Sequence, residues 1–271
     1  MAERWFIKNK KMDYKYMAHK YGITELMSKL IINRDITDDF LIKSYIKPEF
    51  NMLHEPREMK DMNKAVEIII NKIKNKNKIR IIGDYDVDGV ISVYILYCAL
   101  KRCGADVDYE IPDRIKDGYG VNVGIIEKAK DEEIDTIITC DNGISAIDPI
   151  KTAKELGMTV IVTDHHDIPF VEDELGERTF IRSEADAILN PKQEECKYKF
   201  KSLCGAGVAF KLIQVLYEEF KISEEEAFDF IEFLAIATVC DVVDLVDETV
   251  AHHPDQRCQH RANHRRHAHV Q

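Results

Sequence analysis

Acid-rich stretches at four places along the chain could together hold divalent metal ions. They are Asp84-Tyr-Asp86-Val-Asp88-Gly89, Asp141-Asn-Gly143, Asp164-His165-His166-Asp167 and Asp241-Val-Val-Asp244. Two carboxylates about 4 Å apart in one cleft would repel by roughly 4 kcal/mol at an effective dielectric constant of about 20. Divalent cations shared between aspartates remove this repulsion and can activate water. Aspartates with one imidazole suit Mn²⁺ or Mg²⁺, the imidazole favours Mn²⁺, and the lack of cysteine ligands makes zinc a weaker fit.

Each stretch taken alone has a simpler interpretation. Asp84 to Gly89 is similar to part of a calcium-binding loop, but the twelfth position, which needs Glu, holds Ile95. Asp141-Asn-Gly143 alone is typical of a turn. Asp164-His165-His166 alone could lie in a surface loop. The stretches in this order, the first three each directly after an apolar segment, are far more specific than any one of them.

The segments around these stretches indicate strands that alternate with helices. Short β-branched runs predict buried strands, and apolar spacings near 3.6 residues predict amphipathic helices. Strands are expected at 78–83, 107–111, 135–140, 159–163 and 187–190, and helices at 58–74, 89–103, 121–131, 144–156, 207–220 and 223–239. The pattern predicts an α/β fold, a parallel sheet with helices on both faces. Because ligands bind at the carboxyl ends of such strands, the acids should converge on one edge of the sheet.

Composition limits the class of protein. The 271 residues, 45% hydrophobic and 32% charged, suit one main domain, expected at 56–248, after a short helical segment at 1–55. Neither an apolar run of about 18 residues nor an apolar signal core is present, so we expect a cytoplasmic protein without a membrane span. The seven cysteines form no Cys-x-x-Cys pair, which favours core thiols. A net charge of −11 argues against a protein that only grips nucleic acid through a basic surface.

The last part of the chain, 249–271, has a different character. From Val250 onward it contains neither Lys nor Ile, yet it holds six of the ten histidines. It has no apolar periodicity, so we expect it to be disordered. A cloning or reading-frame artefact explains this composition better than a metal-binding histidine tail does.

Taken together, the motifs resemble the DHH phosphoesterases, named for the signature at Asp164-His165-His166, and within them the RecJ branch. The resemblance covers roughly residues 5–248. It is carried by Gly83-Asp-Tyr-Asp-Val-Asp-Gly89, Ile111-Pro-Asp-Arg114 with Gly118-Tyr-Gly120, Thr139-Cys-Asp-Asn-Gly-Ile-Ser145, Val162-Thr-Asp-His-His166, Leu189-Asn-Pro-Lys192, Gly205-Ala-Gly-Val-Ala-Phe-Lys211 and Ala237-Thr-Val-Cys-Asp-Val-Val243. The second and sixth of these stretches favour RecJ over the wider superfamily.

The resemblance implies a set of metal ligands. Asp86 and Asp88 would bind metal, and Asp141 would bridge two ions, Mn²⁺ or Mg²⁺. His165 would ligate one ion and Asp241 the other.

It also implies roles around the ligands. His166 would face the scissile phosphate as a donor or general acid, while Asp164 and Asp84 would orient His165 and the first acidic loop without binding metal. Arg114 would contact a phosphate. The Gly205–Gly207 turn could offer backbone N–H groups to another phosphate, or it could be a helix start with packing value only.

The chain departs from the family pattern at three points. Ile82 stands where many members carry a His, and Asp84 or water would fill that role. Asp244 stands where Pro often follows Asp-Val-Val. RecJ proteins also have a DHHA1 domain and a DNA-binding OB domain after this part, and both are absent from this sequence.

The activity implied by the resemblance is metal-dependent 5′ to 3′ hydrolysis of single-stranded DNA to 5′-mononucleotides, in DNA repair and recombination. A repair helicase or a single-strand-binding protein is the implied partner, and the protein is expected to be a monomer. Two alternatives stay open. One is a phosphoesterase acting on oligonucleotides, cyclic dinucleotides or pyrophosphate. The other is a nucleic-acid-binding scaffold with little activity. Without the two further domains, weak DNA binding and low turnover are expected.

Overall fold

A five-stranded parallel sheet forms the centre of the molecule in the computed structural model, which describes residues 10–115, 120–173 and 176–252. The strand order is β2-β1-β3-β4-β7. The strands are β1 (Lys78–Ile82), β2 (Asp106–Glu110), β3 (Thr136–Cys140), β4 (Thr159–Thr163) and β7 (Ala187–Leu189). The β-branched runs of the sequence supply these strands because such side chains pack well on a sheet buried on both faces. The predicted α/β class is confirmed.

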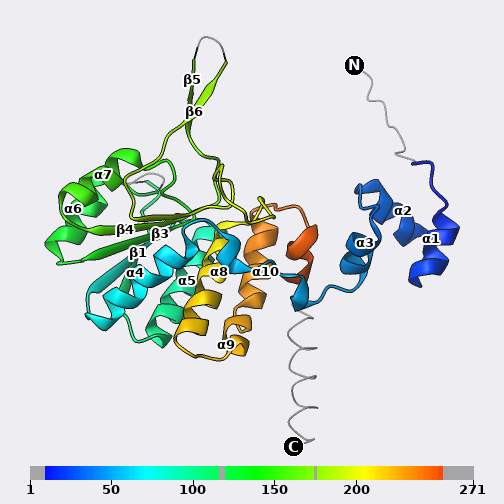
Figure 1. The fold of residues 1–271 in the computed structure, drawn as a ribbon, viewed down its shortest axis with the longest axis horizontal. Helices are drawn as coiled ribbons and strands as arrows, with labels where there is room; N and C mark the ends of the chain where they lie inside the picture. Colours follow the sequence, from blue (N-terminus) through cyan, green and yellow to red (C-terminus); the bar gives the residue numbers. More distant parts are fainter. Residues whose placement is uncertain (1–9, 116–119, 174–175, 253–271) are drawn as a thin grey trace, which may run out of the picture.

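Helices cover both faces of this sheet (Figure 1). One face packs against α4 (Met62–Lys74), α5 (Val87–Arg102) and α8 (Gly205–Glu219), and the other against α6 (Val123–Asp131) and α7 (Ile147–Glu155). Alternate residues of a strand explain the two layers: Ile81 lies in the first core and Ile82 in the second. No helix among the described residues is long and apolar enough to cross a membrane.

The C-terminal part consists of α9 (Glu224–Phe228), α10 (Ile231–Cys240) and the 3-10 helix η3 (Asp247–His252). The prediction of a single helix at 223–239 is therefore wrong in detail, since the helix is interrupted between α9 and α10. Disorder was predicted from Thr249, yet Thr249, Ala251 and His252 are buried in η3. That boundary is too early, because η3 packs on α10. The rest of the predicted tail, 253–271, lies outside the described residues.

The N-terminal segment forms three short helices with a small core of their own. They are α1 (Tyr14–Tyr21), α2 (Glu25–Asn33) and α3 (Asp39–Ile46), followed by the 3-10 helices η1 (Phe50–Met52) and η2 (Pro56–Glu58). Ile31, Ile32 and Ile42 are buried in this core, and α3 lies against η3. Figure 1 shows these helices beside the C-terminal helices and away from the sheet.

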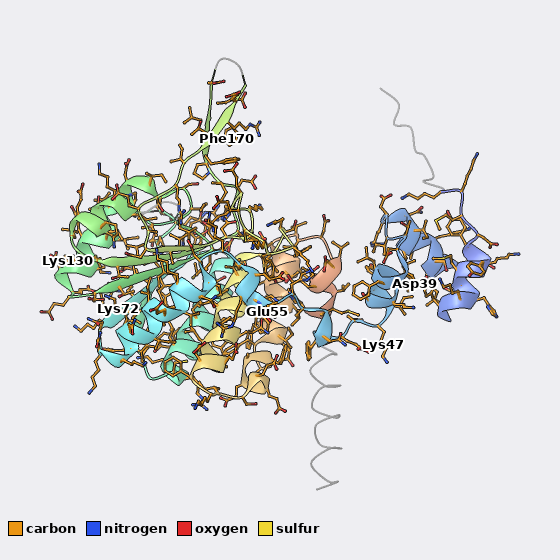
Figure 2. All side chains as sticks on the ribbon, in the orientation of Figure 1. Asp39, Lys47, Glu55, Lys72, Lys130 and Phe170 are labelled. Carbon is orange, nitrogen blue, oxygen red and sulfur yellow. The ribbon has the colours of Figure 1, made fainter. Side chains whose placement is uncertain are left out.

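An antiparallel hairpin that the sequence did not predict follows the Asp-His-His stretch. Its strands are β5 (Phe170–Glu172) and β6 (Arg178–Phe180), and both are exposed. The hairpin extends away from the sheet (Figure 1), and Figure 2 shows Phe170 on it, far from the helical layers.

Candidate metal centre

The acidic loops meet where the strand order reverses direction. β1 pairs with β2 on one side and with β3 on the other, so the loops that follow β1 and β3 begin side by side and then lead to opposite sides of the sheet. The crevice beyond the carboxyl ends of such strands is the usual ligand site of an open α/β sheet. The first loop carries Asp84, Asp86 and Asp88, and the second begins with Asp141.

Groups of acidic and imidazole side chains are close enough here to hold metal ions. In one set, Asp84, Asp86 and Asp141 offer ligand atoms within 4.8 Å of one another. In a second set, Asp88, His165 and Asp241 do the same. Asp141 also forms a set with the two neighbouring histidines, so it lies between the first set and the second. The residues predicted to bind metal are thus brought together.

His165 links the sets, and its geometry fits a metal ligand. Its Nε2 lies 3.0 Å from Asp141 Oδ1 and 3.7 Å from Asp88 Oδ2, and its Nδ1 lies 3.7 Å from Asp241 Oδ2. Although Nε2 and Asp141 Oδ1 are close, neither buried atom makes a hydrogen bond of normal geometry within the described chain. Two unsatisfied ligand atoms that face the same space are what a shared cation requires.

The environment of Asp84 favours a different role from the orienting one predicted. Both of its carboxylate oxygens are buried and accept no well-formed hydrogen bond from the residues that the structure describes. Burial raises the pKa of Asp84, and the backbone of Tyr85 and the charge of His166 offset this only in part. Its place beside Asp86 and Asp141 fits a direct ligand better than an orienting residue. Ile82 is buried in the core and cannot bind metal, so the substitution of its role by Asp84 or water stays a prediction.

The start of α8 holds Asp88. The backbone N–H of Gly205 donates to Asp88 Oδ2 at 2.6 Å, and that of Ala206 donates to Oδ1 at 2.9 Å. This hydrogen bond disfavours the phosphate contact predicted for Gly205, because its amide already has an anionic partner. Gly207 lies further into the buried helix, which disfavours its predicted contact with a phosphate as well.

Close packing explains why glycine stands at 205. A Cβ at Gly205 would lie 2.7 Å from the Cβ of Asp141, closer than real contacts allow. The helix start therefore touches the aspartate of the neighbouring loop. No local pattern in the sequence indicates this contact, because the two residues are far apart along the chain.

Asp164 orients His166. Its Oδ1 accepts from His166 Nδ1 at 2.7 Å and from the His165 N–H at 2.7 Å, and its Oδ2 accepts from the Ile144 N–H at 2.8 Å. The hydrogen bond to Asp164 raises the pKa of His166. Burial alone would raise the pKa of Asp164, but the bonds and charge of His166 lower it. The predicted orienting role thus applies to the ring of His166, while Asp164 holds His165 only through its backbone.

Burial and neighbouring carboxylates disfavour the charged forms of the remaining acids. Burial, and then the neighbouring charges of Asp88 and Asp86, raise the pKa of Asp141 far above its ordinary value. Burial likewise raises the pKa of Asp241. Asp141 also adopts a left-handed backbone, with φ of 58°, which is uncommon for a residue with a side chain. Strain and uncompensated charge of this kind gather at functional sites.

Arg114 lies at the edge of the same region. Its Cζ is 5.4 Å from the ring centroid of Tyr85, which stands between Asp84 and Asp86. The guanidinium is exposed and remains a predicted phosphate contact. The neighbouring Gly118 lies outside the described residues.

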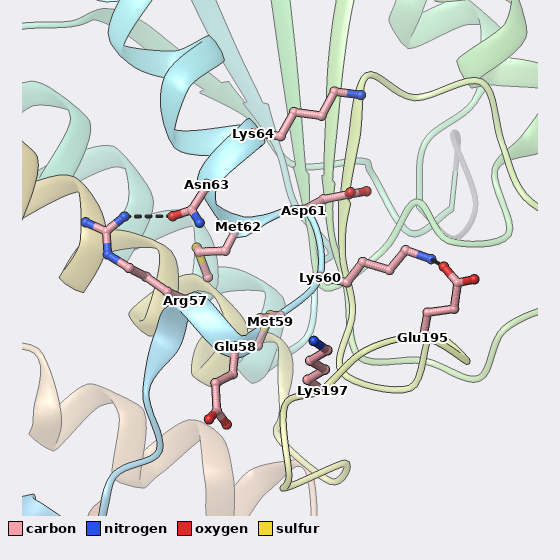
Figure 3. Close-up of a pocket in the computed structure, with 10 residues that line it drawn as sticks. All are labelled: Arg57, Glu58, Met59, Lys60, Asp61, Met62, Asn63, Lys64, Glu195 and Lys197. Carbon is pink, nitrogen blue, oxygen red and sulfur yellow. Dashed lines mark hydrogen bonds and ion pairs between the residues drawn. The ribbon is translucent and has the colours of Figure 1, made fainter.

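A separate pocket of about 330 Å³ lies at the start of α4 (Figure 3). Across it, Lys60 donates to Glu195 at 2.9 Å and Arg57 donates to Asn63 at 2.7 Å. None of the metal-ligand clusters found in the described part of the chain includes a residue of this pocket. The metal centre is therefore a distinct site.

Comparison with known proteins places this chain in a family. A family model described as "DHH family, N-terminal domain" matches residues 78–238, more than half of the sequence. The chain belongs to the DHH family. The matched region contains Asp84 to Asp88, Asp141 and His165 and ends three residues before Asp241.

Within the DHH family, the chain is similar to RecJ proteins. It is 37% identical to the single-stranded-DNA-specific exonuclease RecJ of Bacillus subtilis (strain 168), over 90% of this chain and 29% of the relative. It is 35% identical to the RecJ of Escherichia coli (strain K12), over 70% of this chain and 33% of the relative. This DHH chain therefore spans about a third of the length of these curated relatives.

Solved structures of RecJ proteins are also similar to this chain. A crystal structure of exonuclease RecJ bound to manganese has a TM-score of 0.62 and 29% sequence identity, covering 74% of this chain and 47% of that one. RecJ of Thermus thermophilus in complex with Mn²⁺ has a TM-score of 0.66 over 88% of this chain and 32% of that one. At 24% identity, the second match bears on the fold alone.

Proposed function

We propose that this chain is the metal-binding part of an exonuclease that hydrolyses phosphodiesters of single-stranded DNA from the 5′ end, with two divalent ions, Mn²⁺ or Mg²⁺. The observation that carries the proposal is the meeting of five aspartates and His165 at one edge of the sheet, with buried ligand atoms left unsatisfied. The similarity to RecJ proteins supplies the substrate class. In this proposal the protein acts in the cytoplasm during DNA repair and recombination, beside a helicase or a single-strand-binding protein.

The candidate ligands form two sets, one for each ion. Asp84, Asp86 and Asp141 would hold one ion, and Asp88, His165 and Asp241 the other. Ions bound there would polarise the scissile phosphate and lower the pKa of the attacking water. Asp141, between the two sets, would keep the ions together.

Proton transfer falls to His166. Asp164 accepts a hydrogen bond from its Nδ1 and so orients the ring, and the protonated ring would donate its proton from Nε2. The raised pKa of His166 favours that charged form. As water attacks phosphorus, the bond to the 3′ oxygen of the terminal nucleotide breaks, and His166 would protonate that oxygen. The products are a 5′-mononucleotide and a strand shorter by one residue.

The test uses single-stranded DNA that carries its label at the 5′ end, or at the 3′ end, in Mn²⁺, Mg²⁺ or EDTA. The expected result is metal-dependent release of a labelled mononucleotide from the 5′-labelled strand at the first turnover. The 3′-labelled strand should instead shorten step by step. Faster hydrolysis of a dinucleotide than of a long strand would contradict the proposed substrate and favour a small-substrate phosphoesterase. Asp106→Asn, at the opposite edge of the sheet, is the matched control and should retain parent activity.

A further inference from the structure

A buried ion pair joins α8 to the segment that follows α10. Lys211 Nζ lies 2.7 Å from Glu248 Oε2, and both side chains are almost fully buried. Lys211 also donates to the backbone carbonyl of His54 at 3.0 Å. Burial lowers the pKa of Lys211, and the carboxylate of Glu248 partly restores it. A lysine inside the otherwise apolar run of α8 is costly to bury, so its pairing needs a reason.

Glu248 is held by more than this pair. Its Oε1 accepts from the hydroxyl of Tyr198 at 2.5 Å, and its Oε2 accepts from the His54 N–H at 3.1 Å. Three parts of the chain that are distant in sequence thus fix one carboxylate. We call Lys211, Glu248 and Tyr198 the latch.

The segment fixed by the latch carries Asp241. Asp241 is the C-cap residue of α10, and the next residue, Val242, has φ of 56°. A β-branched residue disfavours this left-handed conformation strongly. Such a turn persists only where the surrounding structure determines it on both sides. Toward α10, the turn is held by the hydrogen bond from the Val243 N–H to the Thr238 carbonyl at 3.1 Å. After the turn, the first buried charged residue is Glu248.

The same helix connects the latch to the other side of the metal centre. α8 begins with the Gly205 and Ala206 amides that hold Asp88, and Lys211 lies in its second turn. One helix therefore contacts Asp88 directly and pairs with Glu248, which follows Asp241 in the same C-terminal segment. These two aspartates share a candidate metal set with His165.

We propose that the latch is a positioning device that sets the Asp241 carboxylate opposite Asp88 and thereby fixes the affinity of this half of the metal centre. The inference rests on the proposed two-metal function. Buried charge pairs add little to stability but can specify one conformation. The latch specifies the turn at Val242, and residues that orient ligands without touching the metal typically change its affinity about 10- to 100-fold.

The test replaces both charges at once, with Lys211→Met and Glu248→Gln, because removal of one partner would leave a buried charge and could unfold the chain. The double variant should melt close to the parent temperature. Calorimetric titration should show one Mn²⁺ ion bound about 10-fold or more weakly and the other unchanged. Tyr198→Phe, which removes only one hydroxyl from the latch, should weaken the same ion by a smaller factor and provides the test if the double variant fails to fold. Arg102→Met with Glu226→Gln, an exposed pair joining α5 to α9, is the control and should change neither ion.

A second comparison separates positioning from general loosening. In an Asp241→Asn background, the latch variants should change Mn²⁺ affinity by less than about 2-fold, because the residue through which they act is gone. Equal losses in both backgrounds, or unchanged Mn²⁺ affinity in folded latch variants, would overturn the inference while leaving the proposed function intact. A parent chain that binds no Mn²⁺ would overturn both.

Discussion

Asp141 has the environment of a carboxylate whose charged form needs a bound cation. It is buried, Asp86 and Asp88 are nearby, and its Oδ1 faces His165 without a hydrogen bond of normal geometry. Its pKa is raised in the folded state, so the folded chain without metal binds a proton more tightly than the unfolded chain does. Stability without metal therefore falls as pH rises above the ordinary carboxyl pKa.

Replacement of Asp141 should therefore have opposite effects with and without metal. In EDTA at pH 8, Asp141→Asn should melt at a higher temperature than the parent, because the parent must take up a proton at this carboxylate on folding and the asparagine need not. In Mn²⁺ the order of the melting temperatures should reverse. Binding of one Mn²⁺ ion at 100 times its dissociation constant stabilises the folded parent by about 2.7 kcal/mol. Differential scanning calorimetry measures both. An equal gain from Mn²⁺ in the two proteins would show that Asp141 is not a ligand.

The neighbouring histidines should separate binding from chemistry. His166→Gln should lower turnover by roughly 10²- to 10⁴-fold and leave the Mn²⁺ dissociation constant unchanged, because it removes a proton donor. His165→Gln should weaken Mn²⁺ binding instead, because it removes a ligand. Steady-state kinetics and Mn²⁺ titration of both variants check this. Weaker metal binding in His166→Gln with normal turnover would reverse the two assignments.

At the scale of elements, α8 connects most of the centre. Its first residues contact Asp141 and Asp88, and Lys211 in its second turn reaches Glu248. A glycine at the helix start is easily interpreted as a phosphate-binding turn, since exposed amides favour anions there. The anion is Asp88, 117 positions earlier in the chain, which no local pattern could reveal.

Two glycines of α8 make a matched test of this contact. Gly205→Ala places a methyl group 2.7 Å from Asp141, so either the helix start or Asp141 must move. We expect a loss of roughly 1–3 kcal/mol in unfolding free energy and weaker Mn²⁺ binding. Gly207→Ala meets only the side chain of Leu203, with Cδ2 at 3.0 Å and Cβ at 3.3 Å, and should cost clearly less than Gly205→Ala. Urea unfolding of both variants measures the difference, and similar values for the two would contradict the close approach.

η3 gives the fold a pH dependence of its own. His252 is buried, its Nδ1 lies 3.1 Å from Thr238 Oγ1, and burial lowers its pKa to about 3. The unfolded chain takes up a proton at about pH 6.5 while the folded chain does not. Stability should therefore be complete above that pH and fall as pH decreases from about 6.5 toward 3. His252→Asn keeps a donor but cannot titrate, so it should reduce the dependence of the melting temperature on pH between about pH 7 and 4. An unchanged dependence on pH would contradict the role assigned to His252.

For the whole molecule, the sequence predicts the layers better than the contacts between them. The sheet follows from runs such as Lys78–Ile82 and Thr159–Thr163, whose β-branched residues suit a doubly covered sheet. The position of the acids follows from the parallel order of those strands. The hairpin at Phe170–Phe180 has no strong strand pattern because both of its strands are exposed, and it was missed.

The features that the sequence did not indicate have a common physical cause. Asp84 was predicted to orient the loop, and its unsatisfied oxygens become visible only when burial is known. The packing of η3 on α10 likewise depends on tertiary contacts, although composition suggested disorder from Thr249. The net charge of −11 is consistent with a site that needs cations before it can accept a polyanion.

The most direct test of the metal centre is a crystal of this chain grown with Mn²⁺ and measured for anomalous scattering. We predict two strong peaks in the crevice, both within ligand distance of Asp141, one beside Asp84 and Asp86 and the other beside His165 and Asp241. Crystals of Asp141→Asn should lose at least one of these peaks. The absence of anomalous density from this crevice in the parent, at Mn²⁺ concentrations that support hydrolysis, would contradict the proposed two-metal centre.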